Sequence, residues 1–156
     1  MGNATLVIGI GNRYRGDDAL GCLVVDNLRK RSWKGVDVIE HDGEPASLIE
    51  LWQGYSSIII VDAVVSGAKS DTIHRIDLGK RVLPKHFRNY STHTLGVSEA
   101  VELARALGKL PAHIIFLGVE GKRFTSGERL STWLKQAAEI LSAQILGEIQ
   151  EGKDCL

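Results

Sequence analysis

Short apolar runs alternate along the chain with longer segments whose apolar residues recur every three or four positions. The short runs, such as TLVIGI and SIIIVD, are rich in β-branched residues, which is typical of strands buried on both faces. The longer segments have the spacing of amphipathic helices. We expect strands at residues 5–10, 36–40, 57–62, 72–78 and 113–119. We expect helices at residues 18–31, 46–53, 95–107 and 130–146.

This alternation predicts the architecture. Buried strands joined by helices form a mainly parallel sheet that is covered on both faces. Segment 72–78, TIHRIDL, follows the preceding strand too closely for a helix to intervene, so it is expected to pair antiparallel at an edge. The predicted fold class is therefore α/β. It is a three-layer sandwich in which a mainly parallel five-stranded sheet has one antiparallel edge strand and helices on both faces. We expect a single domain over residues 1–156, with a frayed tail at 148–156.

Composition narrows the class of protein. The 156 residues are 44% hydrophobic and 24% charged, with a formal net charge of zero, which argues against a disordered chain and a basic nucleic-acid binder. The two cysteines, Cys22 and Cys155, lack metal-ligand spacing, which favours a reducing compartment. We see no signal peptide and no run of about 18 apolar residues. We therefore expect a cytoplasmic protein with neither nucleic acid nor membrane as a partner.

Three distant polar residues are expected at one edge of the sheet. Ligands of such sheets bind beyond the carboxyl ends of the strands, near the point where strand order reverses. Asp18 follows the first strand and its loop, Asp62 ends the third, and His93 lies in a loop before the helix that precedes the last strand. Two carboxylates and an imidazole suit a divalent metal ion with open coordination positions. We predict a metal-binding and catalytic site from this trio.

Each of these residues also has a purely structural interpretation. Asp17 or Asp18 is suited to cap the helix that follows, which contributes about 1 kcal/mol, although one carboxylate is enough for that purpose. Asp62 is suited to accept hydrogen bonds from loop amides, and His93 to cap a helix or fill the core. His41, also at a strand end, is a rival metal ligand.

The glycine-rich turn after the first strand does not match a phosphate-binding motif. GIGNRY departs from GxGxxG because Tyr14 occupies the third glycine position, and the sequence has no GKS or GKT. Gly9 and Gly11 are instead expected to let the backbone turn sharply, and Asn12 to stabilise that turn. No serine or cysteine has the setting of a catalytic nucleophile. Metal-assisted or general-base chemistry is therefore favoured over covalent catalysis.

Three blocks of sequence resemble the hydrogenase maturation proteases, the endopeptidases that trim the large subunit of nickel-iron hydrogenases. The blocks are VIGIGNRYRGDDALG, IIIVDAVVSG and STHTLGVSEAVELARALG, in the family's order. The resemblance implies a single peptidase domain, of aspartyl or metal-assisted type, and a metal-recognising site of Asp18, Asp62 and His93. It implies nickel carried by the substrate, a large-subunit precursor as partner, and one cut that releases a C-terminal peptide.

Within this resemblance, Asp17 is expected to cap or brace the helix start while Asp18 points at the metal. The chain has Ala19 where many relatives have glycine, which should alter loop flexibility more than chemistry. It also has HDGEPASL where some relatives have a glycine-threonine loop, so His41 and Glu44 are candidates for shaping the peptide cleft.

Two other functions fit part of the pattern. A response-regulator receiver domain also has an acidic pair after its first strand and an aspartate ending its third, which bind magnesium and accept a phosphoryl group. Ser91 or Thr92, and Lys122, are candidates for its remaining parts. The six-residue loop before the acidic pair and the lack of a role for His93 argue against it. A metal- or peptide-binding module without catalysis is the third possibility.

Overall fold

The computed structural model describes residues 4–14, 16–31, 33–70, 72–88, 92–121 and 132–154, and the side chains of all of these except 86, 88, 92–95 and 151–154. The strands are β1 (Thr5–Ile10), β2 (Val36–His41), β3 (Ser57–Val64), β4 (Ile73–Asp77) and β5 (His113–Glu120). The α-helices are α1 (Leu20–Arg29), α2 (Pro45–Trp52), α3 (Thr92–Ala106) and α4 (Thr132–Asp154). Two short 3₁₀ helices are η1 (Gly16–Ala19) and η2 (Lys85–Arg88).

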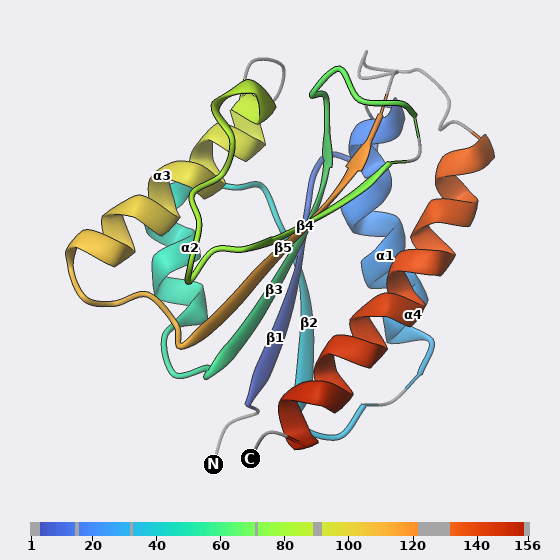
Figure 1. Cartoon of the computed structure of the whole chain (residues 1–156). Coiled ribbons are helices and arrows are strands. Elements are labelled where there is room, and N and C mark those ends of the chain that lie inside the picture. Colours follow the sequence, from blue (N-terminus) through green and yellow to red (C-terminus); the bar gives the residue numbers. More distant parts are fainter. Residues whose placement is uncertain are drawn as a thin grey trace.

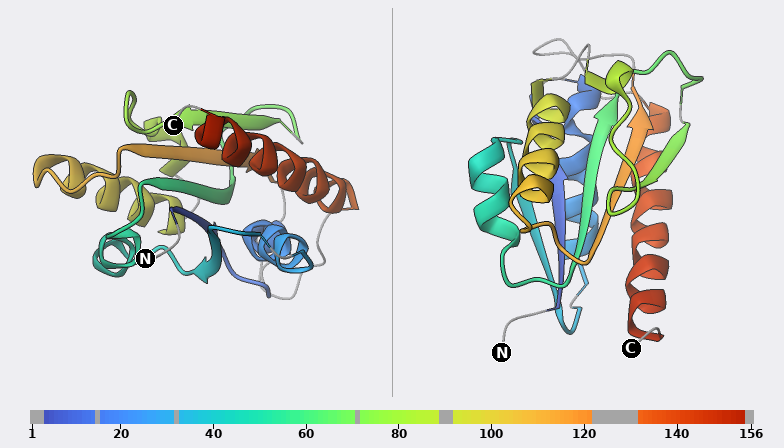
Figure 2. Two further views of the ribbon diagram at one scale, coloured as in Figure 1. Left: turned by 90° about the horizontal axis from the view of Figure 1, so that it is seen from below. Right: turned by 60° about the vertical axis from the view of Figure 1, so that its left-hand side comes forward.

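The five strands form one sheet in the order β2-β1-β3-β5-β4. Strands β2, β1, β3 and β5 are parallel, and β4 pairs antiparallel with β5 at one edge. Helices α2 and α3 cover one face of the sheet, while α1 and α4 cover the other (Figures 1 and 2). The predicted fold class is confirmed, including the antiparallel edge strand.

The apolar runs of the inner strands supply both faces of the core, because successive side chains point to opposite sides of a strand. All six residues of β1 are buried. One set of alternating residues packs under α2 and α3, including Leu6, Ile8, Ile60 and Phe116. The intervening set packs under α1 and α4, including Val7, Ile59, Val61 and Leu117.

Helix α1 lies unusually close to β1, and two glycines allow this approach. A Cβ atom on Gly9 would overlap the carbonyl oxygen of Gly21, and one on Gly21 would overlap the carbonyl oxygen of Ile10. The start of α1 is therefore held directly against the carboxyl end of β1.

Several element boundaries differ from the prediction, most by one or two residues. Helix α1 begins at Leu20 rather than residue 18, because Gly16–Ala19 form a separate 3₁₀ turn. Strand β3 continues to Val64, past residue 62. Helix α3 begins at Thr92 rather than residue 95. Helix α4 continues to Asp154, where the apolar periodicity had faded and a frayed tail was expected from residue 148.

Candidate functional site

The strand order reverses between β1 and β3, and two buried aspartates lie there. The chain leaves β1 toward β2 on one side and leaves β3 toward the other side, so the carboxyl ends of β1 and β3 are neighbours at the reversal. These ends are at the top of Figure 1, where α1 also begins. Asp18 follows β1 in η1, which packs against β3, and Asp62 lies in β3 itself. This is where sheets of this kind bind ligands.

Asp18 is held by a tight turn. Residue Gly11 has a φ of 147°, and a Cβ atom there would overlap the carbonyl oxygen of Asp18. The Asn12 amide donates a hydrogen bond to that same oxygen, at 3.0 Å. Asp17 is 0% exposed and Asp18 is 1% exposed. Burying adjacent carboxylates is costly unless hydrogen bonds or positive charge stabilise them, and such groups concentrate at functional sites.

The expectation that an acidic side chain caps α1 is wrong. Its N-cap position is Ala19, which has no side-chain oxygen to accept the helix's amide hydrogens, and the two aspartates lie one and two residues earlier in the 3₁₀ turn. Neither aspartate therefore occupies the N-cap position of α1. Whether Asp17 braces this turn, as the resemblance implies, stays a prediction.

Asp62 lies on the face of the sheet that α2 and α3 cover. It is 0% exposed and stands in β3 two residues before the strand ends, so it lies inside the strand rather than at its end as expected. It alternates in phase with Ile60 and Val64, which pack on this face. Its partner on β5 is Gly118, which has no side chain.

His93 begins a helix on this same face. It lies in the first turn of α3 rather than in the preceding loop, as had been expected, and α3 starts at the carboxyl edge of the sheet (Figure 1). The first helical turns rest on the β2–α2 loop, because a Cβ atom on Gly96 would overlap the carbonyl oxygen of Gly43. The side chain of His93 is outside the described residues. Among the side chains that are described, no three potential metal ligands cluster.

His41 has a local structural role rather than that of a rival ligand. Its Nδ1 accepts a hydrogen bond from the Gly43 amide at 2.9 Å, so Nε2 carries the proton and donates to Ser47 Oγ, also at 2.9 Å. Glu44 caps α2 by accepting from the amides of Ala46 and Ser47, at 2.9 and 2.7 Å. This loop therefore fixes the platform on which α3 begins.

Comparison with known proteins agrees with the residue blocks. The family model of the hydrogenase maturation proteases matches residues 22–148. A putative hydrogenase maturation protease of Methanocaldococcus jannaschii is 31% identical over 154 residues, covering 94% of this chain and 96% of that protein. The chain belongs to the hydrogenase maturation protease family.

Further relatives of this protease agree in sequence and fold. The hydrogenase 2 maturation protease of Escherichia coli is 26% identical over 149 residues, which covers 94% of this chain and 90% of that protein. The structure of the hydrogenase maturating endopeptidase HybD from E. coli superposes with a TM-score of 0.83 at 24% identity, covering 95% of this chain and 93% of that one. The chain is thus a protease of this family.

The receiver-domain alternative is wrong. Receiver sheets have the strand order 2-1-3-4-5 and are parallel throughout. In this protease the order is β2-β1-β3-β5-β4, and the edge strand β4 is antiparallel to β5. Ser91 and Lys122, the residues considered for that function, lie outside the described residues.

Cys22, which lies in the first turns of α1, is not suited to be the protease's nucleophile. It is a free, buried cysteine, and burial raises the pKa of its thiol to about 11. A thiol with this pKa is almost wholly protonated at neutral pH and is therefore a weak nucleophile.

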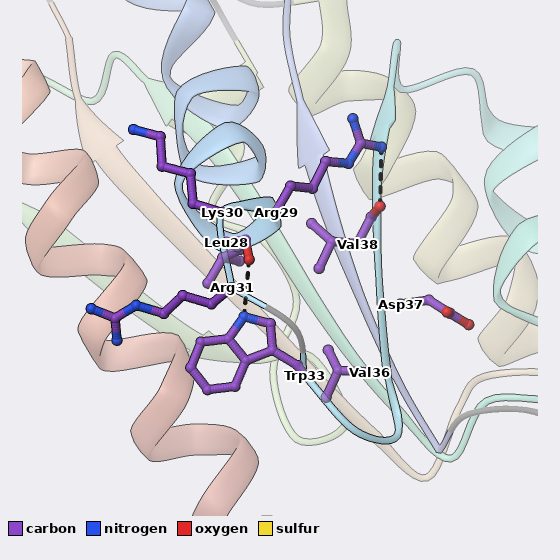
Figure 3. Close-up of a pocket in the computed structure, with 8 residues that line it drawn as sticks. All are labelled: Leu28, Arg29, Lys30, Arg31, Trp33, Val36, Asp37 and Val38. Atoms are coloured by element: carbon purple, nitrogen blue, oxygen red, sulfur yellow. Dashed lines mark hydrogen bonds between the residues drawn. The ribbon is translucent and has the colours of Figure 1, made fainter.

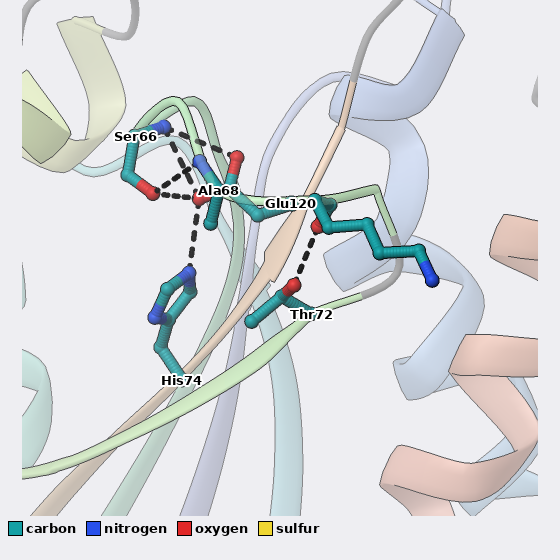
Figure 4. A network of polar contacts seen from close by, with 6 residues as sticks. Ser66, Ala68, Thr72, His74 and Glu120 are labelled. Atoms are coloured by element: carbon teal, nitrogen blue, oxygen red, sulfur yellow. Dashed lines mark hydrogen bonds and ion pairs between the residues drawn. The ribbon is translucent and has the colours of Figure 1, made fainter.

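A second polar cluster lies farther along the carboxyl edge, and sequence reasoning missed its centre. Glu120, at the end of β5, is 2% exposed. Its carboxylate accepts from the Ser66 amide at 3.1 Å, from the Ser66 hydroxyl, and from His74 Nε2 at 2.9 Å (Figure 4). The hydroxyl donates to the glutamate and not to the histidine, so this is not a nucleophilic triad. The only signal for it in the sequence is that the apolar run HIIFLGV is followed directly by the charged residue Glu120.

One hollow of the described surface lies at the opposite edge of the protease. It has a volume of about 460 Å³ and lies at the end of α1, where its lining includes the consecutive basic residues Arg29, Lys30 and Arg31. In Figure 3 Arg29 reaches to β2, where it donates to the carbonyl oxygen of Val38 at 3.1 Å, and Lys30 extends away from Trp33. Trp33 Nε1 donates to the carbonyl oxygen of Leu28 at 2.9 Å. Basic residues at a helix C-terminus offset its partial negative charge, which accounts for this cluster without a ligand.

Proposed function

We propose that this protease removes a C-terminal peptide from the nickel-loaded precursor of a nickel-iron hydrogenase large subunit. In this proposal Asp18, Asp62 and His93 recognise the nickel ion, which the precursor carries. The main support is the burial of two aspartates near the strand-order reversal, Asp18 in η1, which packs against β3, and Asp62 in β3 itself. Helix α3, which contains His93 in its first turn, begins at the same edge of the sheet.

The chemistry of the three residues suits such an ion. Carboxylate oxygens and an imidazole nitrogen bind first-row divalent metals, and three ligands leave positions for groups of the precursor. The substrate's nickel supplies Lewis acidity toward the scissile carbonyl or a water molecule. The residues of the protease orient that metal centre so that a water molecule can attack the peptide bond that follows it. Either aspartate is a candidate for general base, so aspartyl-type and metal-assisted hydrolysis both remain within the proposal.

The proposal includes the compartment in which the reaction takes place. None of the described helices is long and apolar enough to cross a membrane. A free buried cysteine fits a reducing compartment, and a net charge of zero offers no general attraction for nucleic acid. We therefore propose that the protease meets its precursor in the cytoplasm.

The direct test incubates the protease with its purified cognate precursor, loaded with nickel or free of nickel, and weighs the products by mass spectrometry. We expect the nickel-loaded precursor alone to lose a single C-terminal peptide. Cleavage of the nickel-free precursor at the same rate would contradict nickel recognition. If neither sample lost mass, the proposed activity would be wrong.

Single-residue variants test the site in the same assay. Asp18→Asn, Asp62→Asn and His93→Ala should each abolish cleavage while retaining the circular dichroism spectrum of the folded protein. Glu139→Gln, at an exposed position on α4, is the matched charge-removing control and should cleave normally. Asp17→Asn should weaken stability more than cleavage. Equal losses of folding in the Asp17 and Asp18 variants would refute this division of roles.

A further inference from the structure

Tyr14 lies on the loop between β1 and η1 and is the most exposed large hydrophobic residue of the described chain. It is 77% exposed, and the next values are 59% for Ile140, 58% for Val82 and 57% for Leu107. Single exposed hydrophobic residues are common on protein surfaces, so exposure alone indicates nothing. What distinguishes Tyr14 is how firmly its loop is held and how close it lies to the proposed site.

Side-chain and backbone hydrogen bonds fix this loop on both sides. The Asn12 amide donates to the carbonyl oxygen of Asp18, and Asn12 Oδ1 accepts from the Tyr14 amide at 2.9 Å. The Arg13 guanidinium binds both carboxylate oxygens of Asp26 on α1 at 2.8 Å, and it also binds Glu40 on β2. The loop is thus tied to two separate elements while the Tyr14 ring extends into solvent.

The loop that carries Tyr14 is also adjacent to the turn that carries Asp18. Tyr14 is two positions along the chain from Asn12, so their Cα atoms are at most about 7 Å apart. The amide of Asn12 in turn lies 3.0 Å from the carbonyl oxygen of Asp18. The exposed Tyr14 side chain therefore belongs to a backbone segment that borders the turn holding Asp18.

We propose that Tyr14 is a docking residue, whose ring contacts an apolar or aromatic side chain of the precursor's C-terminal segment. This inference rests on the proposed function. Tyrosine is enriched at the energetic centres of protein interfaces, because it offers a large ring with few rotatable bonds. A loop already fixed before binding loses little conformational freedom when the partner arrives.

The test measures cleavage of the nickel-loaded precursor at several concentrations. Tyr14→Ala should lower kcat/KM about tenfold, which corresponds to about 1.4 kcal/mol, mainly through a higher KM. The unfolding midpoint should not change, because the side chain is exposed. Tyr14→Phe keeps the ring and should stay within about twofold of the wild type. Leu107→Ala, at a similarly exposed apolar position after α3 at the opposite edge, should cleave normally.

The loop anchor gives a second, independent readout. Arg13→Gln should also raise KM, and combining it with Tyr14→Ala should add little, because both changes remove the same contact. Wild-type kcat/KM in Tyr14→Ala, an equal loss in Tyr14→Phe, or fully additive effects would each overturn the inference while leaving the proposed function intact. If the wild-type chain does not cleave the precursor at all, the proposed function fails and this inference fails with it.

Discussion

Replacing Glu120 tests how the carboxyl edge of the sheet is held together. This carboxylate, at the end of β5, is 2% exposed and accepts hydrogen bonds from the Ser66 amide, the Ser66 hydroxyl and His74 Nε2. Glu120→Ala removes all three acceptor contacts, leaves two N–H donors without this partner, and creates a small cavity. Unsatisfied buried polar groups cost about 1–3 kcal/mol each, and the cavity adds to this. We expect a total loss of about 3–5 kcal/mol in the free energy of unfolding.

The conservative variant separates hydrogen bonding from volume. Oε1 accepts from both Ser66 groups and from His74, whereas the one donor to Oε2 among the described residues is the Ser66 amide. Glu120→Gln can keep its carbonyl oxygen at the Oε1 position, so only the Oε2 contact is replaced by an amide group. The expected loss is about 1–2 kcal/mol, the cost of a single unfavourable buried contact.

Urea denaturation followed by circular dichroism measures both losses, and thermal unfolding checks them. For a chain of this size, 1 kcal/mol corresponds to a shift of about 2–4 °C in Tm. Glu139→Ala, at an exposed site on α4, should stay within about 0.5 kcal/mol of the wild type. A loss below about 1 kcal/mol for Glu120→Ala, or equal losses for alanine and glutamine, would refute the reasoning.

Two further predictions concern the loop before Asp18. Gly11→Ala places a Cβ atom on the carbonyl oxygen of Asp18 at a φ of 147°, so we expect a loss of about 1–3 kcal/mol in stability together with impaired cleavage. Wild-type stability and activity in this variant would show that the turn is not as tight as described. Arg13 lowers the pKa of Asp26 below its ordinary value of 3.8 by donating hydrogen bonds to the carboxylate. Because the folded pKa is depressed, the pair stabilises the protein above about pH 4 and loses this contribution as the pH falls through the folded pKa. The pair is about 40% exposed, so wild type should exceed Arg13→Gln by at most about 1 kcal/mol at pH 7, with the difference vanishing in acid. A difference in urea midpoints that grows toward low pH would contradict this sign.

The order and type of the elements follow from the sequence because hydrophobic periodicity reports local burial. Strand β1 matches its predicted residues 5–10, and the antiparallel edge position of β4 follows from the short connection after β3. Asp18 and Asp62 were placed at the same edge of the sheet by connectivity alone, because parallel strands bring their carboxyl ends together. These features depend on neighbours in the chain or on general rules of handedness.

Contacts between residues that are far apart in the sequence could be identified only in the folded structure. Glu120 meets Ser66 and His74 across three strand ends, and no local pattern pairs residues 46 or more positions apart. In sequence, His41 was as good a candidate ligand as the other site residues. In the structure both of its ring nitrogens form hydrogen bonds, with the Gly43 amide and with the Ser47 hydroxyl. The exposure of Tyr14 likewise depends on where α1 and β2 hold its loop. Periodicity along a chain tells which face of an element is buried, whereas the partner of a polar group is decided only when separate elements pack together.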